Sequence, residues 1–128
     1  SDLGAAYNNI GLVHSNMGEY QKALTFYQKA REIQEKNLPS NHPHLAASHN
    51  NIGSVYDYMG EYSRALSFYE KALQIQLQVL PSDHPSLAVF YDSVGSAHHH
   101  MGDYTEALSF HQKALAIRER CLPSTHPD

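Results

Sequence analysis

The chain repeats itself with a period of 42 residues, and this repeat limits the possible folds more than any other feature. Residues 3–44, 45–86 and 87–128 align without insertions, and sixteen positions carry the same residue in all three copies. A period of roughly 20–50 residues is typical of solenoids, in which each unit buries its apolar face only against its neighbours. We therefore expect one domain over residues 1–128, built from three stacked units.

Each unit is predicted to consist of two helices joined by a short turn. The first helices are expected at residues 3–16, 43–58 and 85–100, and the second helices at residues 21–37, 63–79 and 105–121. A proline can begin a helix without loss, as at Pro43 and Pro85. The glycines at positions 18, 60 and 102 can adopt the left-handed conformation that ends a helix. A Leu-Pro-Ser segment, with its proline at positions 39, 81 and 123, then stops each second helix.

A glycine recurs inside each first helix, at Gly11, Gly53 and Gly95. A glycine in a helix interior costs roughly 1 kcal/mol relative to alanine, so its repetition indicates a steric demand. We expect close approach of the second helix, whose small residues recur at positions 23 and 30 and their counterparts. The remaining core is predicted to be filled by larger side chains and their counterparts, which in the first unit are Tyr7, Ile10, Val13, Leu24, Tyr27 and Ile33.

The unit resembles the tetratricopeptide repeat in the residues that define its helices and turn. In the first unit these residues are Gly11, Gly18, Tyr20, Ala23, Tyr27 and Ala30. The usual repeat has about 34 residues and a closing proline, which here is replaced by Glu35, Leu77 and Glu119. The 42-residue form, with Asn-Asn in the first helix and His-Pro before the next, is similar to kinesin light chain repeats. The resemblance implies an all-α, right-handed superhelical solenoid of six helices.

The resemblance also implies that the first helices line a concave groove that binds a peptide or a segment of a partner protein. Carried over by position, the groove candidates are Asn8, Asn9, Leu12, Ser15, Asn16, Asn50, Asn51, Ser54, Asp57, Tyr58, Asp92, Ser93, Ser96, His99 and His100. An asparagine amide both donates and accepts hydrogen bonds, so it suits the backbone of an extended peptide. The same amides could instead bond across neighbouring helices. The third unit departs from the pattern, because Asp92 and Ser93 replace the asparagine pair.

The charge pattern narrows the class of partner. All nine lysines and arginines lie on second helices, so we expect a polar, partly aromatic groove that is weakly acidic through Asp57 and Asp92. Such a groove favours a neutral or basic segment. The net charge of −4 leaves no surplus for a nucleic-acid-binding face. No apolar run approaches the roughly 18 residues of a membrane span, and we expect no membrane association.

Other chemistry has little support in the sequence. No catalytic motif is present, so we expect a scaffold rather than an enzyme. The three residues His98, His99 and His100 are adjacent on a helix and point in different directions, and the linker histidines at positions 42, 84 and 126 lie one repeat apart. We therefore expect no metal and no other cofactor. His14 and His98 are expected to replace the packing aromatic Tyr56. The single Cys121 suits a reducing compartment such as the cytoplasm.

The two ends of the chain lack a polar capping helix, which solenoids normally need. The register of residues 1–2 matches that of residues 127–128, so the chain is expected to be a piece of a longer array. Without a following unit, the last helix would leave Leu108, Leu115 and Ile117 uncovered. This predicts end-to-end self-association, a head-to-tail contact that need not close. The alternative function is therefore a structural, self-assembling array without a dedicated peptide ligand.

Overall fold

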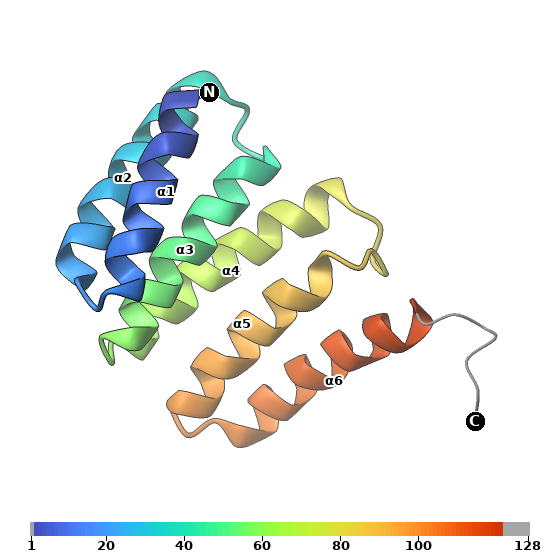
Figure 1. Ribbon diagram of the computed structural model, residues 1–128. Helices are drawn as coiled ribbons and strands as arrows, with labels where there is room; N and C mark the ends of the chain where they lie inside the picture. The colour runs from blue at the N-terminus through green and yellow to red at the C-terminus, as the bar shows by residue number, and fades with distance from the viewer. Residues whose placement is uncertain (1, 122–128) are drawn as a thin grey trace.

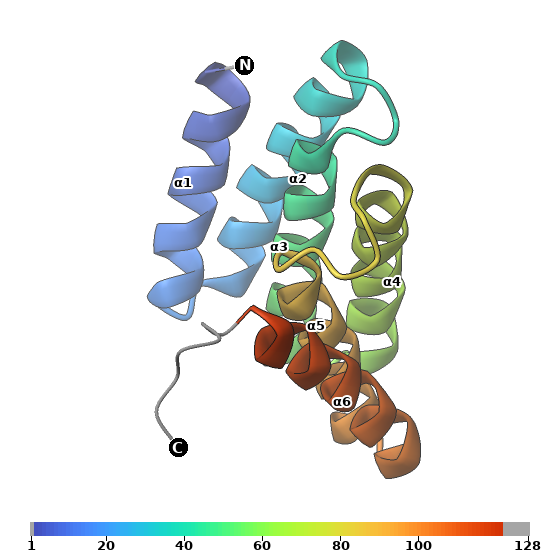
Figure 2. The same cartoon turned by 90° about the vertical axis from the view of Figure 1, so that its right-hand side faces the viewer.

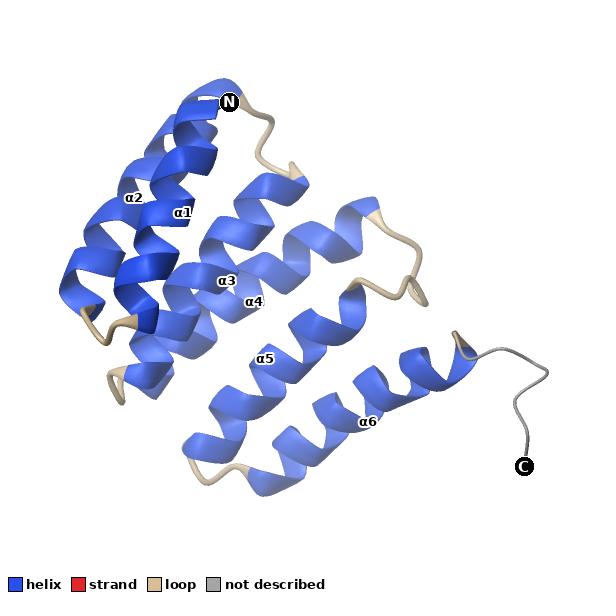
Figure 3. Ribbon diagram, viewed as in Figure 1, coloured by secondary structure: helices blue, strands red, loops and turns tan. Residues whose placement is uncertain are grey.

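A computed structural model describes residues 2–121, which form six helices paired as three antiparallel hairpins (Figure 1). The helices are α1 (Asp2–Asn16), α2 (Tyr20–Asn37), α3 (Pro43–Tyr58), α4 (Tyr62–Val79), α5 (Leu87–His100) and α6 (Tyr104–Arg120). The first helix of each later hairpin packs against the second helix of the hairpin before it. The third hairpin is inclined to the first, as α1 and α6 show in Figure 2. Every regular element within residues 2–121 is a helix (Figure 3), as the repeat predicted.

The helix ends agree with the prediction except at the start of α5. His42 caps α3, because its Nδ1 accepts a hydrogen bond of 3.1 Å from the N–H of His44. Helix α5 was expected to begin at Pro85 but begins at Leu87. The Ala88 N–H bonds to the Pro85 carbonyl at 3.2 Å, three residues back, so a tighter turn precedes the α-helix. The last Leu-Pro-Ser segment and His126 lie outside the described residues.

The turns inside the hairpins contain glycines in the left-handed conformation that was predicted. The φ angles of Gly18, Gly60 and Gly102 are +79°, +82° and +85°. The residue after each glycine donates its N–H to a carbonyl in the last turn of the first helix, as Glu61 does to Tyr56 at 2.9 Å. This closure satisfies a carbonyl that the helix end leaves free.

The glycines inside the first helices allow the close approach that the sequence predicted. A Cβ placed on Gly53 would lie 2.8 Å from the Tyr69 ring and 3.2 Å from the Ala65 carbonyl oxygen. At Gly11 the nearest atom would be the ring of Tyr27, at 2.7 Å. The small residues of the second helices are buried as expected, but the group that excludes a side chain is mainly the aromatic ring.

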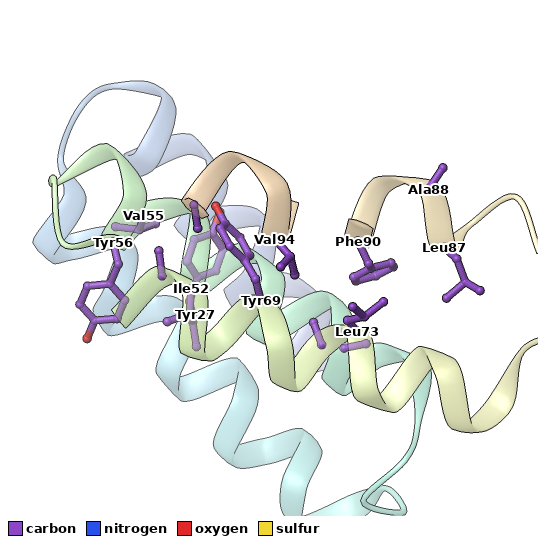
Figure 4. Packing of buried hydrophobic residues seen from close by; sticks show 14 of the residues in the cluster. Tyr27, Ile52, Val55, Tyr56, Tyr69, Leu73, Leu87, Ala88, Phe90 and Val94 are labelled. Carbon is purple, nitrogen blue, oxygen red and sulfur yellow. The ribbon is translucent and has the colours of Figure 1, made fainter. Parts of the chain in front are cut away.

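The core runs through the stack, but α1 of the first hairpin contributes little to it. Tyr27 and Ile52 are buried, and Figure 4 shows them within one packed cluster with Val55. The prediction that Ile10 and Val13 also lie in the core was wrong, because they are 41% and 56% exposed. Their counterparts 42 residues on, Ile52 and Val55, are covered by the preceding hairpin, and no hairpin precedes α1 within the described residues.

Candidate functional site: the concave groove and the ends of the stack

All of the predicted groove residues are exposed or half-buried, and some of them share a pocket. Asn8 and Asn9 of α1 line a pocket of about 230 Å³ together with Gln34 of α2 and His44 of α3. The pocket therefore bridges the first two hairpins. Gln34 was not predicted to line the groove, because it lies on a second helix. Its long side chain extends from α2 to this pocket.

The amide oxygens of Asn8 and Asn50 are buried, and neither has a hydrogen-bond partner among the described residues. These two asparagines occupy the same position in consecutive repeats. A buried acceptor without a donor costs about 1–3 kcal/mol, so neither oxygen is held in its buried position by a hydrogen bond. Rotation about the last side-chain torsion exchanges the oxygen and nitrogen, so either end of the amide can face a ligand.

The third repeat has a charged cluster at the equivalent position. Asp92 accepts a hydrogen bond of 2.8 Å from His111 Nδ1 and forms an ion pair of 2.6 Å with Arg118 Nη1. Arg118 lies on the second helix α6, so a basic side chain meets a groove candidate although the first helices carry no lysine or arginine. The long arginine side chain reaches the first helix from the second. The Asp92 carboxylate is therefore already paired.

The second acidic candidate, Asp57, joins two repeats. Its Oδ1 accepts a hydrogen bond of 2.8 Å from His100 of α5, while its Oδ2 lies 3.4 Å from the Tyr69 hydroxyl. The Tyr69 hydroxyl also lies 3.4 Å from Ser54. Burial raises the pKa of Tyr69 strongly, and the neighbouring Asp57 charge adds to this rise. Tyr69 therefore keeps its single proton at neutral pH and shares it between these two acceptors, so the predicted candidates Ser54, Asp57 and His100 form one network.

Aromatic contacts continue along the turn side of the stack. Tyr20 stacks on Tyr58 with ring centroids 5.8 Å apart, and Tyr62 contacts His100 at 4.9 Å. Each pair joins the start of a second helix to the end of the next first helix. The counterpart in the last hairpin is Tyr104, which is 65% exposed. Tyr104 therefore offers the ring surface that Tyr20 and Tyr62 present to the next repeat.

The two ends of the stack expose the apolar faces that neighbouring repeats cover elsewhere. On α6, Leu108 and Leu115 are 59% and 54% exposed, whereas Leu24, the counterpart of Leu108, is buried. The prediction that Ile117 belongs to this exposed end was wrong, since it is only 5% exposed. Ile117 packs inward in the core and lines a pocket with Tyr91 of α5.

The histidines serve packing and hydrogen bonding in the described part of the chain. His14 and His98 stack on Phe26 and Phe110 at 5.4 and 5.6 Å, just as Tyr56 stacks on its own phenylalanine. The predicted replacement is therefore confirmed. Among residues 2–121, no three histidine, cysteine or acidic side chains are grouped closely enough to hold a metal ion. None of the helices there combines the length and apolar character needed to cross a membrane.

A model of the tetratricopeptide repeat family matches residues 2–78 and residues 65–120. The chain belongs to the tetratricopeptide repeat family. The predicted family and the all-α repeat solenoid are both confirmed. Tetratricopeptide repeats generally mediate protein–protein interactions, and the fold is typically a scaffold without enzymatic activity. Among curated proteins, none matches this sequence.

Solved structures place this tetratricopeptide repeat protein near the kinesin light chain type. One is a Podosopora anserina protein of that type whose TPR-like repeats are nearly identical to one another. Its sequence is 27% identical to this chain, and the two structures superpose with a TM-score of 0.84, covering 96% of this chain and 58% of that one. BtubC (BKLC) from P. vanneervenii is 25% identical, with a TM-score of 0.86 over 98% of this chain and 49% of its own. The chain thus spans about half the length of these two proteins. The N-terminal domain of C. elegans stress-induced protein-1, 20% identical, shares the fold, with a TM-score of 0.70 over 91% of this chain and 84% of its own.

Proposed function

We propose that this tetratricopeptide repeat protein binds an extended segment of a partner protein in its concave groove. The observation that carries the proposal is the pair of buried, unpaired amide oxygens on Asn8 and Asn50, at equivalent positions of consecutive repeats. An extended backbone offers a hydrogen-bonding group every few ångströms, so regularly placed amides suit it whatever its side chains. The pocket beside Asn8 and Asn9 provides space for such a segment.

A neutral or basic partner segment fits the groove best. Asp57 and Asp92 bring two carboxylates to this face, and Arg118 offsets one of them. The remaining charge is negative, which agrees with the net charge of −4 for the chain. The exposed, free thiol of Cys121 suits a protein that works in the cytoplasm, where thiols stay reduced.

The test is a binding measurement with a peptide selected by this protein from a random display library. Asn8→Ala and Asn50→Ala should each weaken binding by about fivefold, as expected for a lost hydrogen bond of about 1 kcal/mol. Asn41→Ala, in an exposed linker, is the matched control and should leave the affinity unchanged. If both groove variants bind the peptide as tightly as the control does, the groove is not the binding site.

A second candidate function is self-assembly by end-to-end stacking, which the exposed ends favour. The exposed Leu108 and Leu115 of one copy would receive the exposed Ile10 and Val13 of the next. Both faces are the counterparts of faces that pack together inside the stack. Sedimentation at increasing concentration should show growing complexes, and Leu108→Glu should abolish them, whereas Ser109→Glu, an exposed neighbour, should have less effect. A strict monomer at millimolar concentration would exclude this function.

A further inference from the structure

A pocket of about 440 Å³ is lined by the second helices α4 and α6 and by α5. Figure 1 shows these three helices side by side, with α5 between α4 and α6. Leu73 and Leu77 line its α4 side, and Phe110 lines its α6 side. Leu73 is buried and projects from α4 toward α5 in Figure 4, while Leu77 is partly exposed. None of the predicted groove residues lines this pocket, so it is a separate surface.

The preceding junction, between α2 and α4, shows what the chain itself places at the equivalent position. There Arg31 is the counterpart of Leu73, and Phe68 is the counterpart of Phe110. The guanidinium carbon of Arg31 lies 5.8 Å from the centre of the Phe68 ring. Its Nε lies 4.0 Å from a carboxylate oxygen of Glu35. The shorter Leu73 cannot extend over Phe110 in this way, so the guanidinium position is open at the second junction.

The acidic partner is also present at the second junction, although at another position. The counterpart of Glu35 is the apolar Leu77, which removes the carboxylate that Arg31 uses. Glu70 lines the pocket and replaces the neutral Gln28 of the first hairpin. Because Glu70 precedes Leu73 by three residues on one helix, the two share a face. The pocket therefore combines an apolar wall, an aromatic ring, the Glu70 carboxylate and the Lys113 ammonium.

Lys113 lines this pocket, and the first junction shows that a lysine at this position can lie beside a second cation. Lys113 lies over the Phe110 ring at 5.1 Å, and Lys71 lies over Phe68 at the same distance while Arg31 occupies its place. The residue that α5 contributes to this pocket also differs from its counterpart at the first junction. At the first junction this residue is His49, whose pKa is lowered by burial and by the positive charges of Arg31 and Lys71. At the second junction it is Tyr91, whose phenol ring is neutral and does not repel a cation.

We propose that this pocket receives an arginine side chain of a partner protein. The guanidinium group stacks on Phe110 and pairs with the Glu70 carboxylate, and the aliphatic part of the arginine packs on Leu73 and Leu77. A planar guanidinium stacks flat on an aromatic face and bonds a carboxylate through its edge, whereas the compact ammonium of lysine cannot stack in this way and an apolar side chain bonds no carboxylate. The partner is therefore a protein whose surface or extended segment presents an arginine to the outer helices of the stack.

The test uses N-acetyl-arginine-amide as the probe, titrated into the whole chain while the methyl resonances of Leu73, Leu77 and Val94 are followed by NMR. We expect saturable shifts at millimolar concentration, and weaker binding of the matched lysine and leucine amides. Leu73→Arg should fill the pocket from within and weaken probe binding at least tenfold. Glu70→Gln should weaken it about two- to fivefold, as for a partly exposed ion pair, while Glu32→Gln, an exposed change outside the pocket, should not.

The reciprocal variant gives an independent result if Leu73→Arg fails to fold. Arg31→Leu should open the same space at the first junction and produce a second set of shifts, at Ile52. The proposal is wrong if the leucine amide binds as tightly as the arginine amide, which would mean a simply apolar pocket. It is equally wrong if a folded Leu73→Arg protein, by circular dichroism, binds the probe as the parent chain does.

Discussion

Ile10 and Ile52 occupy the same position in consecutive repeats, but only Ile52 is covered on both sides. Ile52 is fully buried, whereas Ile10 is 41% exposed. Replacing a fully buried isoleucine by alanine removes both the transferred surface and the packing around it, which typically costs 2–5 kcal/mol. We expect Ile52→Ala to lower the free energy of unfolding by about 3 kcal/mol and Ile10→Ala to lower it by about 1 kcal/mol.

The assay is chemical and thermal unfolding, followed by circular dichroism at low micromolar concentration, which disfavours association between copies. The difference of about 2 kcal/mol corresponds to about 8 °C in melting temperature for a chain of this size. The helix propensity change is identical in the two variants, so it cancels in the comparison. Equal losses of stability would refute the reasoning, because they would show that α1 is covered as completely as α3.

Three further predictions concern single sites. Burial lowers the pKa of His49 below its unfolded value near 6.5. The stability that depends on neutral His49 is therefore complete above about pH 6.5 and is lost as the pH falls through the folded pKa. His49→Tyr should lessen the decline in the free energy of unfolding, measured in urea, between about pH 7 and pH 5. Gly53→Ala should destabilise the fold by about 1–3 kcal/mol in a melting experiment, because the added Cβ meets Tyr69 and a backbone carbonyl. Gln76→Met should leave the free energy of unfolding unchanged or raise it, because the Gln76 amide oxygen is buried without a partner. Its counterpart Gln34 is hydrogen-bonded to Ser48, so Gln34→Met should lower the free energy of unfolding by about 1–3 kcal/mol. Urea denaturation of both variants checks this.

The repeat period made the hairpins predictable, because each helix and turn signal occurs three times in register. The left-handed Gly18, Gly60 and Gly102 and the close approach at Gly53 follow from residue chemistry that acts within one hairpin. Burial depends in addition on whether a neighbouring hairpin exists. Ile10 therefore has the sequence signature of Ile52 but a different environment, and the pattern alone could not separate them.

The candidate site was predicted only in part, because its members come from both helices of a hairpin. The first-helix asparagines were identifiable from the family pattern. The reach of Arg118 to Asp92, and of Gln34 to the pocket beside Asn8, depends on long side chains that cross between helices. The pocket at Leu73 arises from a difference between repeats, whereas a search for shared residues finds only what the repeats have in common.

The exposed Leu108 and Leu115 at one end of the described stack have a consequence for how the fold opens locally. Each hairpin contacts only its neighbours, so the last one can open or be removed by a protease while the others stay folded. Its loss would uncover α4, whose buried Leu73 and half-buried Leu66 would form a new apolar end. Opening of this hairpin would therefore expose on α4 the same kind of apolar face that α6 already exposes.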